Sequence, residues 1–495
     1  MVSKKLVTLI VFVLTSLSLM AQDEWTVVHD DCFGGASETF RRGALRRLPA
    51  INNDWDASKT YHQLVILVSF VDQAFSSNDP KQFYDDMLNK PGYNERQGLG
   101  CMAEYFHAQS NGLLNLQFDI FGPYEVSQVA QPYEKPDKKT RNYGKESFRE
   151  AIDKFIEENP NFDFTPYDWN SDGNIEQVCF IYAGFPGNLG EKTYGYVWPN
   201  TSSISTITTP DGKKISNYTA SGEVWPTSKP VSCGFGTICH EFSHSLGLPD
   251  IYPTNAWAYS ICDEWDLMDG GNFTNYGWCP PNYTPLEKIL MGWMTPLELT
   301  EAQNITNLEP ISKGGATYII RHSDTEFLLL ENRQQSGWDA GVPGHGLVIW
   351  YVDFDKSAWR GNTPNNRENS PRFRIICADG LDYDAWSKKQ EQEGFTTYQN
   401  SNRMNKRYFS TAPYPFGDIN SLAEEYITNI TESTDSLVSF DFKGGASGIR
   451  SVNTHSSPLS SQYFDLQGRY VKEPIKGQLY IVRKADGSKY KTICN

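Results

Sequence analysis

The sequence has few basic residues for its acidity, no closely paired cysteines and no internal repeat. Its 44 lysines and arginines are outnumbered by 60 aspartates and glutamates, which leaves a net charge of −16. A chain this acidic repels phosphate backbones, so we expect no nucleic-acid partner. No two of the 9 cysteines have CxxC spacing. A cysteine-bound zinc is therefore not expected, and we interpret most of the cysteines as buried free thiols.

The only apolar run that approaches membrane-spanning length stands at the N-terminus. Lys4 and Lys5 precede an apolar stretch over 6–19, and Ala21 is followed by the polar Gln22. This order is typical of a signal peptide over 1–21 with cleavage before Gln22. A membrane anchor is the alternative, but the run is short for a hydrocarbon core of ~30 Å. We therefore expect a secreted or cell-surface protein, and we expect it to be a monomer.

The clearest chemical signal is the string CHEFSHSLGLPD over 239–250. Four residues advance a helix by about 400°, so His240 and His244 lie on one face, one turn apart. Two imidazoles placed in this way can both bind one Zn²⁺. Glu241 is placed to take a proton from an attacking water and return it to a leaving amine. The alternative is a pair of packed core histidines; we favour a metal because two of only 8 histidines flank a glutamate in this register.

A catalytic zinc needs a third protein ligand and one open position. Gly247 and Pro249 end the helix predicted over 236–247, since glycine adopts left-handed conformations and proline cannot continue a helix. The chain then turns back, and we predict that Asp250 is the third ligand of a HExxHxxGxxD pattern.

Two residues farther along the chain are candidates for supporting roles. Met268, in the glycine-rich string WDLMDGG, is predicted to lie under the three ligands as a polarizable apolar floor. Taken alone, it would be ordinary core filler. Tyr276 is a candidate hydrogen-bond donor to the developing oxyanion, and simple packing is the alternative.

The string DWNSDGNIE over 168–176 places oxygen ligands at alternate positions around a glycine, as in the first part of an EF-hand-type calcium loop. Position twelve would be Cys179 rather than glutamate, so the full loop is absent. We predict a Ca²⁺ site here, and an Asn/Asp/Gly turn before a strand is the alternative. The predicted ligands are Asp168, Asn170, Asp172, Asn174 and Glu176.

With these motifs, the region over 60–445 resembles the M6 family of metzincin-like proteases, the immune inhibitor A type. The resemblance rests on the zinc string, on WDLMDGG, on PLEK over 285–288 and on flanking strings such as PGHGL over 343–347. It implies a zinc-dependent endopeptidase with His240, His244 and Asp250 as zinc ligands, Glu241 as general base and Met268 in the Met-turn. The tail resembles C-terminal sorting domains, which implies an outer-membrane secretion machine as a partner; its last residues lack the usual basic finish.

The expected fold class is α/β (α+β): a metzincin-like zinc protease domain, then a β-rich region and a small C-terminal β unit. Strands are predicted over 64–70 and 178–183, and helices around 81–89 and 101–110. Short β-type runs follow over 316–321, 327–331, 346–352, 373–377, 437–442, 462–466 and 477–482. The predicted domains are a signal peptide (1–21), an N-terminal segment that is a pro-segment or a surface arm (22–58), a catalytic domain (59–300), a β-rich region (301–443), a linker (444–458) and a sorting-like tail (459–495).

From these features we predict a secreted zinc endopeptidase that hydrolyses proteins or peptides with Zn²⁺, and with Ca²⁺ at the second site. Two other functions remain open at this stage. One is a surface adhesin or glycan-binding protein with an idle protease site, and the intact Glu241 argues against it. The other is a zinc amidohydrolase that acts on small or cell-wall substrates.

Overall fold

The computed structural model describes residues 55–130, 143–189, 197–225, 231–368, 370–376, 386–387, 422 and 425–445, and the segments 462–464, 470–471, 479–483 and 489–493 near the C-terminus. The chain divides into two compact units, 1–448 and 449–495. Within the described residues, no helix is both long and apolar enough to cross a membrane. The predicted signal peptide and most of the N-terminal segment and linker lie outside the described residues.

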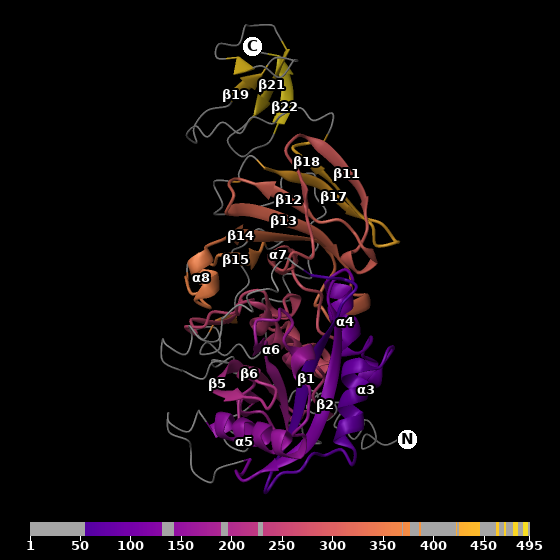
Figure 1. The fold of residues 1–495 in the computed structure, drawn as a ribbon. Helices are drawn as coiled ribbons and strands as arrows, with labels where there is room; N and C mark the ends of the chain where they lie inside the picture. The colour runs from indigo at the N-terminus through magenta and orange to yellow at the C-terminus, as the bar shows by residue number, and fades with distance from the viewer. Residues whose placement is uncertain are drawn as a thin grey trace, which may run out of the picture. The chain divides into compact units, whose positions relative to one another are not determined.

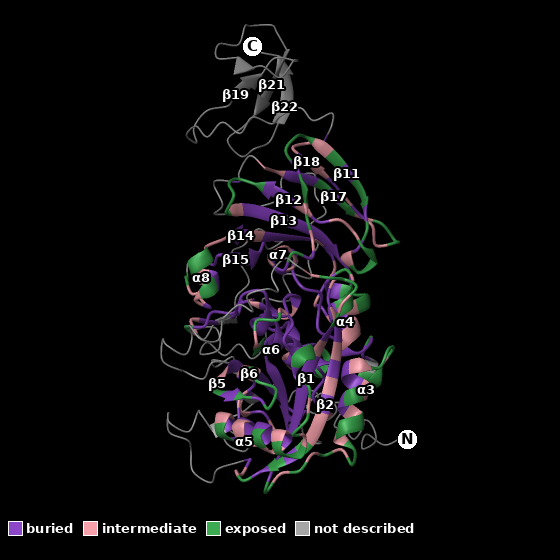
Figure 2. Ribbon diagram, viewed as in Figure 1, coloured by how far each residue is buried: buried purple, intermediate pink, exposed green. Residues whose placement is uncertain are grey.

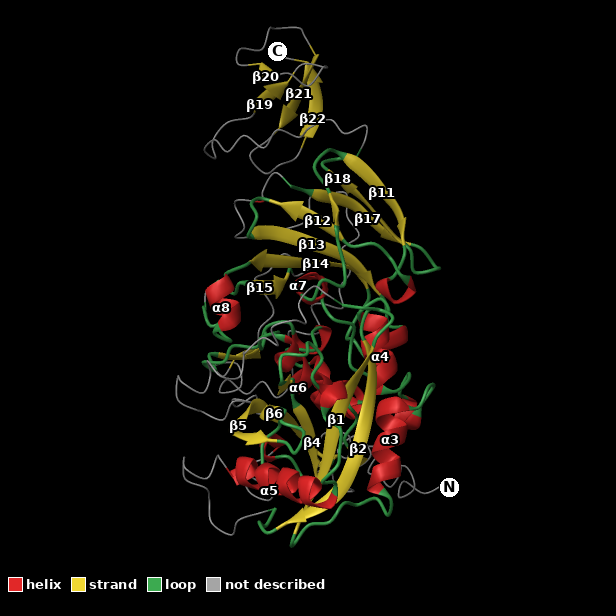
Figure 3. Ribbon diagram, in the orientation of Figure 1, coloured by secondary structure: helices red, strands yellow, loops and turns green. Residues whose placement is uncertain are grey.

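The first part of unit 1 is built on a mostly parallel six-stranded sheet (Figures 1 and 3). Its strand order is β2-β1-β4-β6-β3, with β5 paired antiparallel to β6. β3 and β4 keep the same register offset against β6, so they lie end to end beside it and β5 forms the other edge. The strands are β1 (Thr60–Phe70), β2 (Asn115–Val126), β3 (Asn174–Ile175), β4 (Val178–Tyr182), β5 (Asn200–Thr208) and β6 (Lys214–Gly222).

Helices cover both faces of this sheet, as expected of parallel strands joined by crossovers. β1 is buried along most of its length (Figure 2). Its side chains alternate between two cores. Val65 and Leu67 join the core that contains α3 (Pro80–Asn89), α4 (Met102–Gln109) and α6 (Gly236–Leu246). Leu64 and Ile66 face the opposite core, which is closed by α5 (Tyr143–Glu158).

The second part of unit 1 is β-rich. A five-stranded sheet has the order β10-β12-β13-β14-β15, and a three-stranded antiparallel sheet has the order β11-β18-β17. On β13, Leu328 and Leu330 join a core shared with the three-stranded sheet, whereas Phe327 and Leu329 join the core around α6. The strands are β10 (Leu297–Glu298), β11 (Gln303–Leu308), β12 (Tyr318–Arg321), β13 (Glu326–Arg333), β14 (Gly346–Asp353), β15 (Phe373–Ile375), β17 (Ile427–Glu432) and β18 (Val438–Phe442).

Smaller elements complete unit 1. Of two short helices, α7 (Pro285–Leu290) precedes the five-stranded sheet in the sequence, and α8 (Lys356–Arg360) lies between its strands β14 and β15. Two-stranded pairs are formed by β7 (Val224–Trp225) with β8 (Val231–Ser232) and by β9 (Ala258–Ser260) with β16 (Trp386–Ser387). The five-stranded sheet contributes to both neighbouring cores, so the β-rich part and the α/β part of unit 1 are packed against each other.

In unit 2 the described residues form an antiparallel sheet with the order β20-β19-β21-β22. Its strands are β19 (Gln462–Phe464), β20 (Tyr470–Val471), β21 (Leu479–Arg483) and β22 (Lys489–Ile493).

The structure bears out the mixed α/β class and the helices and strands predicted from local pattern. The cysteine prediction is confirmed for six of the residues, which are buried free thiols: Cys101, Cys179, Cys233, Cys239, Cys262 and Cys279. Cys32, Cys377 and Cys494 lie outside the described residues.

Candidate metal centre

The histidines are carried by α6, a helix buried along nearly its whole length. Its N-terminus packs closely on the segment Gly271–Gly277, where a Cβ on Gly236 would come within 2.2 Å of the Asn272 carbonyl oxygen. Only glycine permits this approach. At the other end, Gly247 has φ 104°, and the Leu248 N–H donates to the Ser243 carbonyl at 3.1 Å. This glycine cap ends the helix as predicted and turns the chain back toward its own side chains.

The structure brings the three predicted metal ligands together. Asp250 Oδ1 lies 3.1 Å from His240 Nε2 and 3.1 Å from His244 Nε2. The ligand atoms of the three residues all lie within 4.8 Å of one another, and all three side chains are buried. Within the described residues, no second cluster of three or more His, Cys, Asp or Glu side chains converges in this way.

Backbone carbonyls fix how the two imidazoles are presented. His240 Nδ1 lies 2.8 Å from the Leu267 carbonyl, and His244 Nδ1 lies 2.8 Å from the Leu248 carbonyl. Each Nδ1 therefore donates to a carbonyl, so Nε2 is the ring atom that faces the shared point beside Asp250. In the metal-free chain, burial would raise the pKa of Asp250, but the charge and hydrogen bonds of His244 and His240 outweigh it and hold that pKa below its usual range. Once a metal displaces the protons on Nε2, two imidazoles and one carboxylate form a donor set that fits Zn²⁺.

The third ligand is held from a distant part of the chain. Asn362 Nδ2 donates to Asp250 Oδ2 at 2.6 Å, and the Asp250 N–H donates to Asn362 Oδ1 at 2.6 Å. Asn362 follows α8, in the β-rich part of unit 1. Sequence reasoning missed this residue, since one asparagine among many carries no local signal of a contact 112 positions away.

Glu241 lies beside the ligands on α6 and is almost fully buried. Thr201, on the edge strand β5, donates through its Oγ1 to the Glu241 carbonyl at 2.5 Å and lies 3.1 Å from Glu241 Oε2. The hydroxyl therefore ties the carboxylate and its backbone to the edge of the sheet. Thr201 was also missed, because a polar Ser/Thr-rich strand gives no apolar pattern to mark it.

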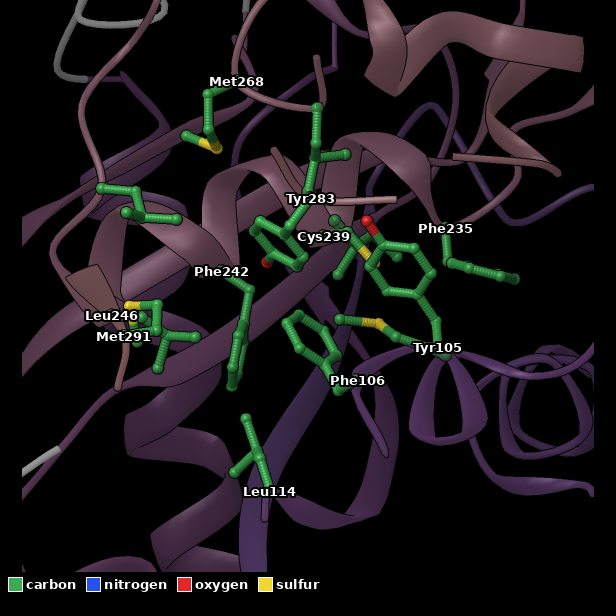
Figure 4. Close-up of a cluster of buried hydrophobic side chains, with 14 of the residues drawn as sticks. Tyr105, Phe106, Leu114, Phe235, Cys239, Phe242, Leu246, Met268, Tyr283 and Met291 are labelled. Atoms are coloured by element: carbon green, nitrogen blue, oxygen red, sulfur yellow. The ribbon is translucent and has the colours of Figure 1, made fainter. Parts of the chain in front are cut away.

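Met268 was predicted to form a floor beneath the ligands, and that role stays a prediction. It is fully buried in the cluster that includes Phe242 and Leu246 of α6 (Figure 4). Its carbonyl accepts the Ile251 N–H at 2.8 Å, directly after the third ligand, and the preceding carbonyl is the one that holds His240. The turn thus contacts both ligand-bearing segments through its backbone.

Tyr276 lies in a strained turn at the protein surface. It has φ 57°, and its side chain is 43% exposed. Its carbonyl accepts the Gly234 N–H at 2.9 Å and the Trp225 Nε1–H at 3.0 Å, and the two rings of Tyr276 and Trp225 meet edge to face. These contacts explain its placement, and its role as an oxyanion donor stays a prediction.

The predicted calcium loop is held by a lysine and by its own amides. Asp168 pairs with Lys213 Nζ at 2.6 Å and accepts the Gly173 N–H at 2.9 Å. Glu176 accepts a backbone N–H of the loop, and burial raises the pKa of its carboxyl to about 7. The ammonium group supplies the positive charge beside Asp168 that a cation was expected to supply.

The remaining predicted calcium ligands are bonded to one another. Asn170 Oδ1 accepts the Asp172 N–H at 2.9 Å, and Asp172 Oδ1 accepts the Asn174 N–H at 2.8 Å. This is the hydrogen-bonding pattern of the Asn/Asp/Gly turn that was the alternative. Ca²⁺ at this loop therefore stays a prediction without support from these contacts.

Known proteins are similar to the segment that carries the site. Residues 54–284 match the immune inhibitor A peptidase M6 catalytic domain. Immune inhibitor A of Bacillus thuringiensis subsp. alesti is 24% identical over 268 residues, which cover 46% of this chain and 38% of that protein. The pre-pro-metalloprotease PrtV of Vibrio cholerae serotype O1 (strain M66-2) is 24% identical over 261 residues, which cover 44% of this chain and 28% of PrtV. The chain thus spans well under half the length of these curated relatives. The segment that is similar to the M6 catalytic domain, 54–284, includes all three metal ligands and Glu241.

Proposed function

We propose that this protein is a zinc-dependent endopeptidase that hydrolyses peptide bonds of proteins. The observation that carries the proposal is the convergence of His240, His244 and Asp250 beside the buried Glu241. The M6 match over 54–284 supports it independently. The catalytic part corresponds to 59–300, and the β-rich region follows over 301–443.

The residues present fit a resident Zn²⁺. His240 and His244 would hold it through Nε2 and Asp250 through one carboxylate oxygen, which leaves one position open. When bound, zinc polarises a carbonyl and lowers the pKa of water toward neutrality. The arrangement has the features of a hydrolytic site rather than a closed structural one, because three protein ligands and no fourth converge within the described residues.

Glu241 is the general base in this proposal. It accepts the proton of the attacking water and then delivers it to the nitrogen of the leaving amine. Thr201 restrains the carboxylate from the side of the sheet edge, so the proton acceptor has a fixed position. Burial keeps bulk water from competing for the same carboxylate.

Export is part of the proposal. We infer that a signal peptide over 1–21 directs the chain out of the cytoplasm and that the tail over 459–495 is read by an outer-membrane secretion machine. N-terminal sequencing of the exported protein tests the first point, and a mature chain that begins at Gln22 is the expected result.

The central test compares the wild type with Glu241→Ala and His244→Ala. We expect Glu241→Ala to keep its zinc but to cleave casein about 10²–10⁴-fold more slowly, since it loses proton transfer. We expect His244→Ala to lose the metal as well. Zinc is measured on the purified protein by elemental analysis, and chelated wild type serves as the inactive control.

The outcomes separate the proposal from its rivals. Casein cleavage that survives in Glu241→Ala would refute the assignment of the base. A wild type that holds zinc yet cleaves only small amides would be an amidohydrolase. A wild type that cleaves neither kind of substrate would point to an idle site.

A further inference from the structure

Two hydrogen bonds of opposite direction join the third metal ligand, Asp250, to Asn362. Asn362 donates to the Asp250 carboxylate through Nδ2 and accepts the Asp250 N–H through Oδ1, both at 2.6 Å. Asn362 is 2% exposed, so water does not compete for either bond. One amide therefore fixes the backbone and the side chain of Asp250 at the same time.

This contact determines which carboxylate oxygen faces the histidines. The Asn362 amide holds Oδ2, and Oδ1 is the oxygen that lies 3.1 Å from both imidazole Nε2 atoms. The amide is neutral, so it orients the carboxylate without cancelling its charge. A hydrogen bond to a charged group inside a protein is among the stronger ones.

The backbone around Asn362 is itself anchored. It has φ 57°, a left-handed conformation that asparagine tolerates better than most residues. Its carbonyl accepts the Thr254 hydroxyl at 2.9 Å. Nearby, Asn365 donates to the Ile251 carbonyl and to the Phe373 carbonyl of β15, both at 2.8 Å. The segment that carries Asn362 is thus fastened both to the loop after Asp250 and to the β-rich sheet.

We propose that Asn362 is the positioning residue for the third metal ligand, so that the β-rich part of the chain completes the metal site. The inference rests on the proposed zinc function, because it gives Asp250 the role of a ligand. Asn362 lies outside the segment 54–284 that matches the M6 catalytic domain. The residues between 54 and 284 therefore supply the three metal ligands, but the side chain that orients Asp250 comes from outside this segment.

The test compares Asn362→Gly with Asn362→Ser in the full-length protein. Glycine accepts the positive φ, so Asn362→Gly removes the side chain without straining the backbone. Serine offers a single hydroxyl that can serve one of the two bonds. Asn366→Ser is the matched control: Asn366 lies on the same segment and bonds to Thr254, at 3.0 Å from Nδ2 to Oγ1, rather than to a metal ligand.

Two readouts besides activity report on the ligand. The first is the zinc dissociation constant from chelator competition, and the second is the visible spectrum of the Co²⁺-substituted protein, which responds to ligand geometry. We expect Asn362→Gly to bind zinc roughly 10–100-fold more weakly than wild type, the usual effect of losing a partner of a ligand. The zinc affinity of Asn362→Ser should lie between those of Asn362→Gly and the wild type. Both Asn362 variants should have a shifted cobalt spectrum, and Asn366→Ser should match the wild type in both measurements.

If a folded Asn362 variant kept the wild-type zinc affinity and cobalt spectrum, the inference would be overturned. Should Asn362→Gly fail to fold, Asn362→Ser against Asn366→Ser decides the question, with circular dichroism as the check on folding. Equal weakening in Asn366→Ser would also overturn it, since the effect would then belong to the segment and not to Asn362. Failure of the zinc function itself would be seen separately, as a wild type that binds no zinc.

Discussion

A buried pair of carboxyl groups, Asp266 and Glu287, makes stability depend on pH in an unusual direction. Asp266 accepts the Met268 N–H at 2.7 Å, and Glu287 accepts the Thr284 N–H at 2.7 Å at the start of α7. Both carboxyls are buried, and the charge of Glu287 acts on Asp266. Because burial and a neighbouring carboxylate both disfavour the charged form, the folded chain favours protonation of the pair.

Burial raises the pKa of Glu287 from its usual 4.5 to about 7, although the Arg333 charge opposes the change. Burial and the nearby charges of Glu287 and Asp269 also raise the pKa of Asp266. Between pH 4.5 and 7 the folded chain therefore holds a proton that the unfolded chain has released. The free energy of unfolding must fall as pH rises through this window, by about 3 kcal/mol for Glu287.

Glu287→Gln removes the part of this dependence that comes from Glu287. The glutamine carbonyl accepts the Thr284 N–H, and its amide donates to Asp266 without needing a proton. We expect Glu287→Gln to raise the free energy of unfolding at pH 8 by about 1–3 kcal/mol over wild type and to flatten its decline between pH 4.5 and 7.

The assay is urea unfolding followed by tryptophan fluorescence, on metal-free protein at several pH values. Glu298→Gln, at an exposed glutamate, is the control and should change stability by less than about 0.5 kcal/mol. A Glu287→Gln protein that was less stable than wild type at pH 8, or that kept the wild-type slope, would show that the pair is not protonated as described.

Three further changes test other parts of the structure. Arg333→Leu should lower the free energy of unfolding by about 3–5 kcal/mol, since it leaves the buried Asp339 and Glu331 without their ion-pair partner. Adding Asp339→Leu should recover part of this loss. A urea titration that finds a loss of less than about 1 kcal/mol for Arg333→Leu contradicts the prediction. Thr201→Val should reduce kcat on casein about tenfold at unchanged zinc content, because the Glu241 carboxylate loses its hydrogen bond from the Thr201 hydroxyl. An unchanged kcat would show that this hydrogen bond does not position Glu241. Zinc at 100 times its dissociation constant should stabilise the protein by about 2.7 kcal/mol; calorimetry that finds the same Tm with zinc and with chelator speaks against a folded-state site.

The parts of the fold that sequence reasoning recovered are those coded by neighbouring residues. The helix over 236–247 is confirmed as α6, ending at Leu246 with Gly247 as its cap, because a histidine pair and a terminal glycine are local features. The buried strands over 64–70 and 178–183 are confirmed within β1 and as β4, since continuous apolar runs mark them. β5 and β6 were missed because polar residues interrupt their apolar pattern.

The residues of the candidate site likewise fall into those that local sequence predicts and those that only tertiary packing brings together. The spacing of His240, His244 and Asp250 predicted their convergence, since all three lie within one helix and the turn after it. Asn362 and Thr201 approach this site from 112 and 40 positions away, and such contacts depend on tertiary packing alone. At the predicted calcium loop, Asp168 is paired with Lys213, a contact that the loop sequence does not predict, and Ca²⁺ there stays a prediction.

The pairing of Asn362 with Asp250 has a consequence for how the protein is made. A chain that has left the ribosome only as far as α6 already carries its two histidines, but the amide that steadies Asp250 is still untranslated. Domains fold largely in the order of synthesis, and contacts between distant positions form late. A half-made molecule should therefore hold its third metal ligand poorly, and the metal site should be complete only after the segment that carries Asn362 has been synthesised and packed.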